Sequence, residues 1–166
     1  AFLGLGRHTV RTGPDGARRT AWFERDGRRY FLKVHSGIGW REIAKCWLQG
    51  KPAVVDALTE TRALERLAEL GIPAPRLVAY GVHGWNPARR RSFVLTEALS
   101  DTEDLAEFLA PAPRLSFVER SALTRALGDL TGRLHAARIA HRDLYLTHFR
   151  LRRAPKGAFE LVLIDL

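Results

Sequence analysis

Hydrophobic and polar positions alternate in two segments near the start of the chain. Residues 20–23 read Thr-Ala-Trp-Phe, and residues 28–34 read Arg-Arg-Tyr-Phe-Leu-Lys-Val. Alternation of this kind is typical of β-strands, and the Asp26-Gly27 dipeptide between the segments favours a two-residue hairpin turn. The pattern therefore predicts a β-hairpin whose second strand carries Lys33.

Two later segments carry apolar residues at helical spacing. In residues 56–70 the leucines recur at intervals of three, and Gly71 stands where a helix would end. This predicted helix carries Glu60 and Glu65. We choose Glu60 as the partner of Lys33.

In residues 38–48 the apolar positions recur at i, i+3, i+4, i+7 and i+8, and the charged residues lie opposite. Such a stripe is most often buried against its own domain. The alternative is a docking helix for lipid or for a protein partner, because paired tryptophans on a basic helix suit an anionic interface. The stripe consists of Trp40, Ile43, Ala44, Trp47 and Leu48.

The last third of the chain combines a loop motif with two short strands. A His-Arg-Asp tripeptide at residues 141–143 precedes a strand at 149–151, and the apolar run 161–164 ends on Asp165. In eukaryotic-type kinases this order places a catalytic base and a magnesium ligand around the γ-phosphate of ATP. We therefore assign Asp143 as the catalytic base and Asp165 as the ligand of Mg²⁺.

A kinase makes further demands upstream, and the chain meets them in the expected order. Lys33 in its strand can grip the α and β phosphates, and Glu60 on the following helix can hold that lysine. A strand at residues 92–96 then runs into Glu97 and Leu99, whose backbone we expect to bind adenine. These elements predict an α+β, protein-kinase-like fold with two lobes.

Two departures from protein kinases concern the nucleotide. No Gly-x-Gly-x-x-Gly motif precedes the lysine, so we assign the phosphate cover to an irregular loop that contains Gly13 and Gly16. His148 stands where protein kinases place a magnesium-binding Asn. Imidazole nitrogen suits Mn²⁺ better than Mg²⁺. His148 is therefore an uncertain metal ligand, with a hydrogen-bonding role or simple packing as alternatives.

With these residues in place, the chain resembles the bacterial lipopolysaccharide core heptose kinases, specifically the heptose I kinases. The resemblance covers most of residues 17–166. It rests chiefly on Tyr-Phe-Leu-Lys-Val-His at 30–35, Ser-Phe-Val-Leu-Thr-Glu at 92–97 and the motif His-Arg-Asp-x-Tyr-x-x-His-Phe at 141–149.

The resemblance implies transfer of the γ-phosphoryl group of ATP to a heptose hydroxyl of the lipopolysaccharide inner core. It also implies an acyl carrier protein as a partner, and residues 38–48 are the segment we assign to that protein or to an anionic membrane surface. The expected location is cytoplasmic, peripheral at the inner face of the bacterial inner membrane.

The chain length limits the architecture. With 166 residues, one good core or two small lobes can be buried. A complete kinase large lobe would need roughly 100 more residues. We therefore expect a complete small lobe over residues 1–98 and a truncated large lobe over residues 99–166.

Composition narrows the class of protein. The formal net charge is +9, and residues 1–55 hold 11 basic and 4 acidic groups. This excess suits a polyanionic acceptor, a nucleic acid or an anionic membrane. Nucleic acid is disfavoured, because the aromatic residues do not interleave with the basic ones as stacking platforms. One cysteine excludes an internal disulfide, and no apolar run approaches the ~20 residues of a membrane span.

Three other functions stay open at this point. A different small-molecule kinase, such as an aminoglycoside phosphotransferase, would carry Gly in place of Arg142 and Asn in place of His148. A protein kinase would show the glycine loop and the same Asn. A non-catalytic kinase-like binding module could retain Lys33 and Asp165 without turnover, and an assay of ATP turnover separates it from the enzymes.

Overall fold

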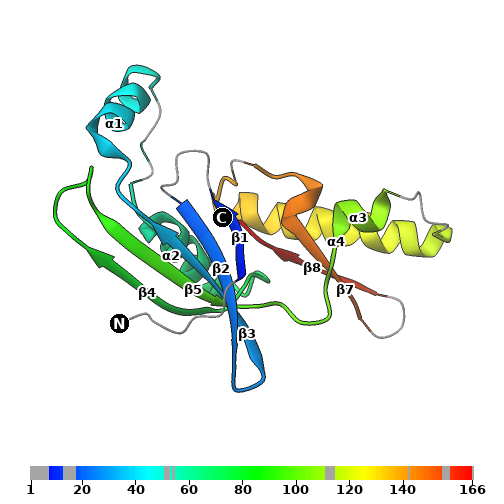
Figure 1. Ribbon diagram of the computed structural model, residues 1–166. Helices are drawn as coiled ribbons and strands as arrows, with labels where there is room; N and C mark the ends of the chain where they lie inside the picture. Colours follow the sequence, from blue (N-terminus) through cyan, green and yellow to red (C-terminus); the bar gives the residue numbers. More distant parts are fainter. Residues whose placement is uncertain are drawn as a thin grey trace. The chain divides into compact units, whose positions relative to one another are not determined.

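The computed structural model divides into two compact units (Figure 1). Unit 1 consists of Ala1–Glu65 and Arg76–Ala98, and unit 2 of Arg66–Pro75 and Leu99–Leu166. The structure describes residues 8–12 (backbone only), 18–50, 53, 55–110, 115–141, 143–154 and 158–165.

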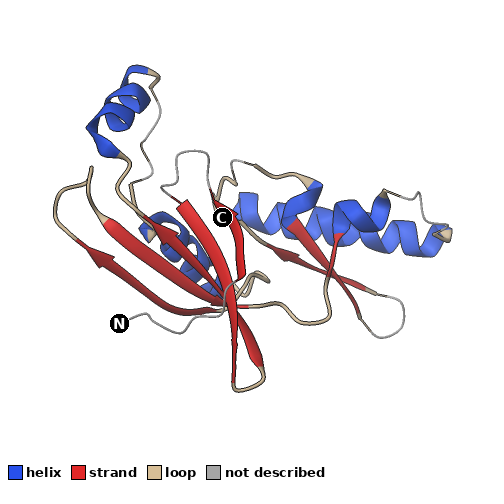
Figure 2. Cartoon of the chain, in the orientation of Figure 1, coloured by secondary structure: helices blue, strands red, loops and turns tan. Residues whose placement is uncertain are grey.

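Unit 1 is built on a five-stranded antiparallel sheet with two helices (Figure 2). In spatial order the strands are β1 (His8–Thr12), β2 (Arg18–Arg25), β3 (Arg28–His35), β5 (Arg91–Glu97) and β4 (Leu77–His83). The helices are α1 (Gly39–Leu48) and the first part of α2 (Leu58–Glu69), whose residues from Arg66 onward belong to unit 2.

The predicted hairpin is confirmed in β2 and β3. Trp22 pairs with Phe31 across the two strands. Asp26 and Gly27 have φ angles of 53° and 72°, which are the positive values that a two-residue hairpin turn of this type requires. The hairpin places Lys33 in β3, between β2 on one side and β5 on the other.

The start of α2 is fastened to β5 and to the connection before it. The Asp56 carboxylate accepts a hydrogen bond from the Leu58 N–H at 3.0 Å and pairs with the Arg90 guanidinium at 2.7 Å. The Ala57 N–H donates to the Ser92 hydroxyl at 2.9 Å. These contacts satisfy backbone donors of the first turn and fix where the helix begins.

Unit 2 contains a three-stranded antiparallel sheet, in the order β6 (Glu103–Asp104), β7 (Phe149–Arg153) and β8 (Phe159–Leu163). Its helices are α3 (Leu105–Leu109), α4 (Phe117–Ala136) and the short 3₁₀ helix η1 (Leu146–His148). Ser116 begins α4 with a capping box to Glu119. The strands predicted around residues 149–151 and 161–164 are thus present.

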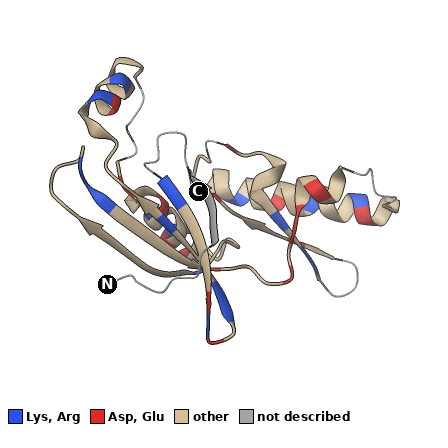
Figure 3. Cartoon of the chain, viewed as in Figure 1, with Lys and Arg blue, Asp and Glu red and all other residues tan. Residues whose placement is uncertain are grey.

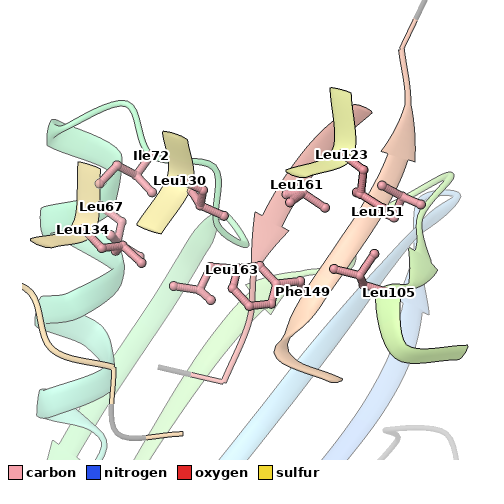
Figure 4. Close-up of a cluster of buried hydrophobic side chains, with 10 residues drawn as sticks. All are labelled: Leu67, Ile72, Leu105, Leu123, Leu130, Leu134, Phe149, Leu151, Leu161 and Leu163. Carbon is pink, nitrogen blue, oxygen red and sulfur yellow. The ribbon is translucent and has the colours of Figure 1, made fainter. Parts of the chain in front are cut away.

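The apolar core of unit 2 is a cluster of ten buried side chains (Figure 4). They are Leu67, Ile72, Leu105, Leu123, Leu130, Leu134, Phe149, Leu151, Leu161 and Leu163.

Leu67 and Ile72 explain why residues 66–75 belong to unit 2, although the order of elements predicts a single lobe over residues 1–98. The Arg133 guanidinium also donates to the Gly71 carbonyl oxygen at 2.7 Å. The lobe boundaries themselves stay a prediction.

Helix α1 forms over the predicted segment, but its apolar stripe is not buried. Ile43 is 3% exposed, whereas Trp40 is 55%, Trp47 is 68% and Leu48 is 90% exposed. Burial of the whole stripe, the commoner outcome for such a pattern, is therefore wrong for this helix. Among the described residues, no helix is both long enough and apolar enough to cross a bilayer.

Candidate active site

Unit 1 brings the predicted lysine and glutamate together. The Lys33 ammonium donates to Glu60 Oε1 at 2.7 Å, and the two side chains are 26% and 14% exposed. The short distance and the partial burial make this a charge-assisted hydrogen bond that is stronger than a surface ion pair. Glu65, the other candidate on the helix, is exposed. The role of the pair in holding phosphates stays a prediction.

The pair is positioned by regular backbone on both sides. Lys33 faces Thr20 in β2 and Val94 in β5 across the two ladders, so its backbone cannot shift without breaking sheet hydrogen bonds. Glu60 lies in the first turn of α2. The contacts of Asp56 set that turn, and so they also set the position of the carboxylate.

A buried histidine close to this pair was not assigned any role from the sequence. His35 follows Lys33 by two residues in β3 and is 8% exposed. Burial lowers the pKa of His35 to about 4, and the positive charges of Arg18 and Lys33 act in the same direction. The imidazole is therefore neutral at physiological pH. The only sequence signal was its place at the end of an alternating strand.

The end of β5 shows which backbone groups remain for a ligand. The Glu97 N–H donates to the Arg76 carbonyl oxygen at 2.9 Å, and the Ala98 N–H donates to the Arg29 carbonyl oxygen at 2.8 Å. Among the described residues, the Leu99 N–H has no backbone acceptor. The Glu97 carboxylate pairs with Arg28 at 3.2 Å and with Arg76 at 3.4 Å. Adenine binding by this segment stays a prediction for the backbone alone.

In unit 2, His141 connects the loop of Asp143 to the end of β8. Its Nδ1 accepts a hydrogen bond from the Asp143 N–H at 3.2 Å, so its Nε2 carries the proton and donates to the Ile164 carbonyl oxygen at 3.3 Å. The Ile164 N–H in turn donates to the His148 carbonyl oxygen at 2.9 Å. His141 thus braces the loop through these two hydrogen bonds, and Asp143 is exposed.

His148 lies between Asp143, the predicted catalytic base, and Asp165, the predicted metal ligand. Its Nδ1 donates to the Asp143 carbonyl oxygen, which also accepts from the Tyr145 N–H at 2.8 Å. Its Nε2 lies 4.0 Å from Asp165 Oδ2. Asp165 has a φ of 59°, a left-handed conformation that aspartate tolerates better than most residues.

The donor set fits a divalent cation only in part. No group of three or more His, Cys, Asp or Glu side chains that could hold a metal occurs in the part of the chain that the structure describes. Asp165 offers the carboxylate oxygen that Mg²⁺ prefers, and His148 offers a nitrogen. In nucleotide-binding enzymes the phosphates and water supply the remaining oxygens. Asp165 and His148 are therefore the residues that would hold such an ion.

Three residues of the predicted site lie outside the described residues. They are Gly13 and Gly16, which were assigned to the phosphate cover, and Arg142 of the loop motif.

Comparisons with known proteins show what the chain is similar to. The model of the lipopolysaccharide kinase (Kdo/WaaP) family matches residues 9–166. The lipopolysaccharide core heptose(I) kinase WaaP of Pseudomonas aeruginosa is 44% identical over 158 residues, which cover 90% of this chain and 58% of that protein. The protein of the same name from Escherichia coli K12 is 36% identical over 137 residues, covering 81% of this chain and 51% of that protein. The chain thus spans about half the length of these relatives.

Two solved structures resemble the fold. WaaP in complex with acyl carrier protein matches with a TM-score of 0.75 and 34% identity, over 98% of this chain and 61% of that chain. The MAP kinase LmaMPK10 from Leishmania major matches with a TM-score of 0.53 and 17% identity, over 98% of this chain and 45% of that chain. The second match concerns the fold alone. Together they confirm the predicted α+β, protein-kinase-like fold.

Proposed function

The chain belongs to the lipopolysaccharide kinase (Kdo/WaaP) family, and from this premise we propose that it catalyses phosphoryl transfer from ATP to a heptose hydroxyl of the lipopolysaccharide inner core. The observation that carries the kinase chemistry is the ion pair between Lys33 and Glu60 at 2.7 Å. The heptose acceptor rests on the relatives that are 44% and 36% identical and carry the name of heptose(I) kinases.

The pair gives the nucleotide a fixed cation. Glu60 holds the ammonium of Lys33 at one place, from which it donates hydrogen bonds to the α and β phosphates. Because the neighbouring His35 is neutral, the local positive charge is concentrated on the lysine. The backbone around Glu97 and Leu99 binds the adenine ring, and the segment with Gly13 and Gly16 covers the phosphates.

Asp143 acts on the acceptor. Its carboxylate orients the sugar hydroxyl and takes its proton as the hydroxyl oxygen forms a bond to the γ-phosphorus. The bond from that phosphorus to the bridging oxygen breaks, and ADP leaves with the electron pair. Mg²⁺, or Mn²⁺ in its place, neutralises charge on the phosphates when bound by Asp165. His141 keeps Asp143 in position through the backbone.

The proposal includes partners and a location. The core acceptor is a lipid-linked anion, so the enzyme works in the cytoplasm beside the inner face of the inner membrane. An acyl carrier protein is a further proposed partner, supported by the similar structure of WaaP in complex with such a protein. Nucleic acid is not among the proposed partners.

One acceptor screen tests the function. The protein is incubated with γ-labelled ATP and with one of three acceptors: a heptose-containing core oligosaccharide without phosphate, an aminoglycoside, or a general protein kinase substrate. We expect label on the core oligosaccharide alone, and none with Asp143→Ala. Label on the aminoglycoside or the protein instead would assign another kinase activity. ATP binding without transfer to any acceptor would indicate a non-catalytic module.

A further inference from the structure

The apolar stripe of α1 is held at one edge and exposed over the rest. Ile43 is its buried member, at 3% exposure. Trp40, Trp47 and Leu48 follow at the spacing of one helix face and are 55%, 68% and 90% exposed. An exposed leucine alone would need no explanation, but two exposed tryptophans beside it on one face do.

The connection between β4 and β5 adds a third tryptophan to the same end of unit 1. Trp85 is 89% exposed. The Gly39 N–H at the start of α1 donates to the Ala88 carbonyl oxygen in this connection at 3.0 Å. A Cβ on Gly37 would lie 2.3 Å from that oxygen, so the two segments are in close backbone contact. Figure 1 shows α1 beside this connection.

The connection is itself held in place. The Arg90 guanidinium donates to the carbonyl oxygens of Gly84 and Trp85 at 3.3 Å and 3.4 Å, and it pairs with Asp56 at 2.7 Å. Asn86 Oδ1 accepts from the Ala88 N–H at 2.9 Å. The backbone under Trp85 is therefore ordered while its indole is exposed to solvent.

Basic residues accompany the three tryptophans. Figure 3 marks Lys and Arg positions on α1, where Arg41 and Lys45 are exposed. Arg89 and Arg91 are exposed in and just after the connection. The acidic side chain on α1 is Glu42, which lies 3.4 Å from Lys45 and offsets only part of this charge.

We propose that this surface, formed by Trp40, Trp47, Leu48 and Trp85 with the basic residues around them, binds the surface of an anionic lipid bilayer. Indole rings prefer the boundary between acyl chains and head groups. A fluid bilayer accepts three separately protruding indoles without the matching pocket that a folded partner would need. Basic side chains beside them attract anionic head groups.

The surface deepens the proposed function and rests on it in one respect. Only the purpose of membrane binding depends on the proposed function, because a lipid-linked acceptor would lie at a bilayer. The binding itself is inferred from the exposed residues alone.

Vesicle binding tests the proposal directly. Vesicles of phosphatidylcholine, with and without roughly one third of phosphatidylglycerol as the anionic lipid, are floated with the protein. We expect binding to the anionic vesicles that weakens as salt rises. Three of the four tryptophans lie in the surface. Brominated lipids should therefore quench most of the fluorescence.

Matched variants separate the surface from general effects. Removing Trp40, Trp47 and Trp85 by substitution with Ala should weaken vesicle binding about tenfold for each tryptophan. Trp22→Phe, which removes the tryptophan of β2, should leave binding unchanged. Circular dichroism and thermal unfolding of each variant check that the fold persists.

The charges are tested in the same way. Arg41→Gln and Lys45→Gln should each weaken binding to anionic vesicles about fivefold. Arg25→Gln, the same change at the tip of the β2–β3 hairpin, should have no such effect.

Three results would overturn the proposal. One is equal vesicle binding by the wild type and the triple tryptophan variant. Another is protection of the indoles from iodide in the absence of vesicles, which would mean that protein covers the surface. The last is binding of an acidic carrier protein, lost in the triple variant, without any vesicle binding.

A separate readout distinguishes this failure from a failure of the kinase proposal. Transfer from ATP to a water-soluble core oligosaccharide is measured without vesicles, and the triple variant should retain it. Phosphoryl transfer without vesicle binding refutes only the proposal that the surface binds a bilayer. Vesicle binding without phosphoryl transfer to any acceptor refutes only the proposed kinase activity.

Discussion

The region of Lys33 in unit 1 and the loop of Asp143 in unit 2 hold their functional side chains in different ways. Lys33 is fixed through its own side chain, by a hydrogen bond of 2.7 Å to Glu60 between a central strand and a helix. Asp143 is fixed through its backbone, whose N–H and carbonyl oxygen bond to the rings of His141 and His148.

This difference suits the two proposed roles. A group that grips phosphate in every cycle gains from a preset position, because less conformational entropy is then lost on binding. A catalytic base has to reach the hydroxyl of the acceptor, so its carboxylate must be accessible. Backbone fixation orders the loop and leaves the Asp143 side chain to the acceptor.

The largest expected effect concerns the catalytic role of Asp143 in its loop. Asp143→Asn preserves the backbone contacts to His141 and His148 but removes the proton acceptor. We expect turnover to fall by ~10²–10⁴-fold, the usual contribution of a general base, with unchanged ATP affinity. Single-turnover transfer and nucleotide titration measure the two quantities. Equal losses of turnover and ATP affinity would contradict the separation of roles.

A second effect is specific to unit 1 and depends on pH. His35 has a pKa of about 4 in the folded chain against 6.5 when unfolded, because it is buried beside Arg18 and Lys33. Between these values the unfolded state binds a proton that the folded state does not. The free energy of unfolding should therefore fall as pH decreases from 6.5 to 4, by at most about 3 kcal/mol.

Urea unfolding between pH 7 and 4 measures this slope, and hydrogen exchange shows which unit opens first. We expect unit 1 to lose protection before unit 2. His35→Gln should flatten the slope, whereas His83→Gln, at an exposed position of β4, should not. The same slope in both variants would exclude His35 as the source.

A third prediction compares two Lys–Glu pairs within unit 1. Lys33→Ala leaves the Glu60 carboxylate, at 14% exposure, without its partner at 2.7 Å. The cost should be about 1.5–3 kcal/mol in unfolding free energy, together with weaker ATP binding. Lys45→Ala removes an exposed pair to Glu42 at 3.4 Å and should cost at most about 0.5 kcal/mol. Similar costs for both would mean that partial burial adds nothing.

Much of this comparison could be predicted from the sequence, because local signals and long-range partners agreed. The turn dipeptide at residues 26–27 fixes the register of the hairpin, and the register places Lys33 inside the sheet. The helix that carries Glu60 is the next element with a leucine stripe directed inward. The kinase pattern, in which a glutamate of this helix holds the lysine of the strand, then predicts the Lys33–Glu60 pair.

Burial was the part that local patterns could not supply. The stripes of α1 and α2 look alike in sequence, yet Leu67 is 0% and Trp47 is 68% exposed. Periodicity tells which face of a helix is apolar and not whether another element covers it. His35 was missed for the same reason, since its burial depends on partners distant in sequence, such as Ser92 across the β3–β5 ladder.

The smallest expected effect concerns the metal at the loop. Because His148 Nδ1 donates to the Asp143 carbonyl oxygen, its Nε2 is the atom that faces Asp165, at 4.0 Å from Oδ2. Imidazole nitrogen favours Mn²⁺ over Mg²⁺, whereas an amide oxygen favours the harder Mg²⁺. His148→Asn should therefore lower the Mn²⁺ to Mg²⁺ affinity ratio severalfold while changing stability little.

The ratio is measured by electron paramagnetic resonance of Mn²⁺, with Mg²⁺ as competitor and a non-hydrolysable ATP analogue present. Tyr145→Phe is the control, because its ring lies 6.2 Å from the His148 ring and the change leaves the imidazole in place. If His148→Asn loosens the loop but keeps the metal ratio, His148 is a brace like His141. The two histidines would then share one structural role, and Asp165 would be the metal ligand that the loop contributes.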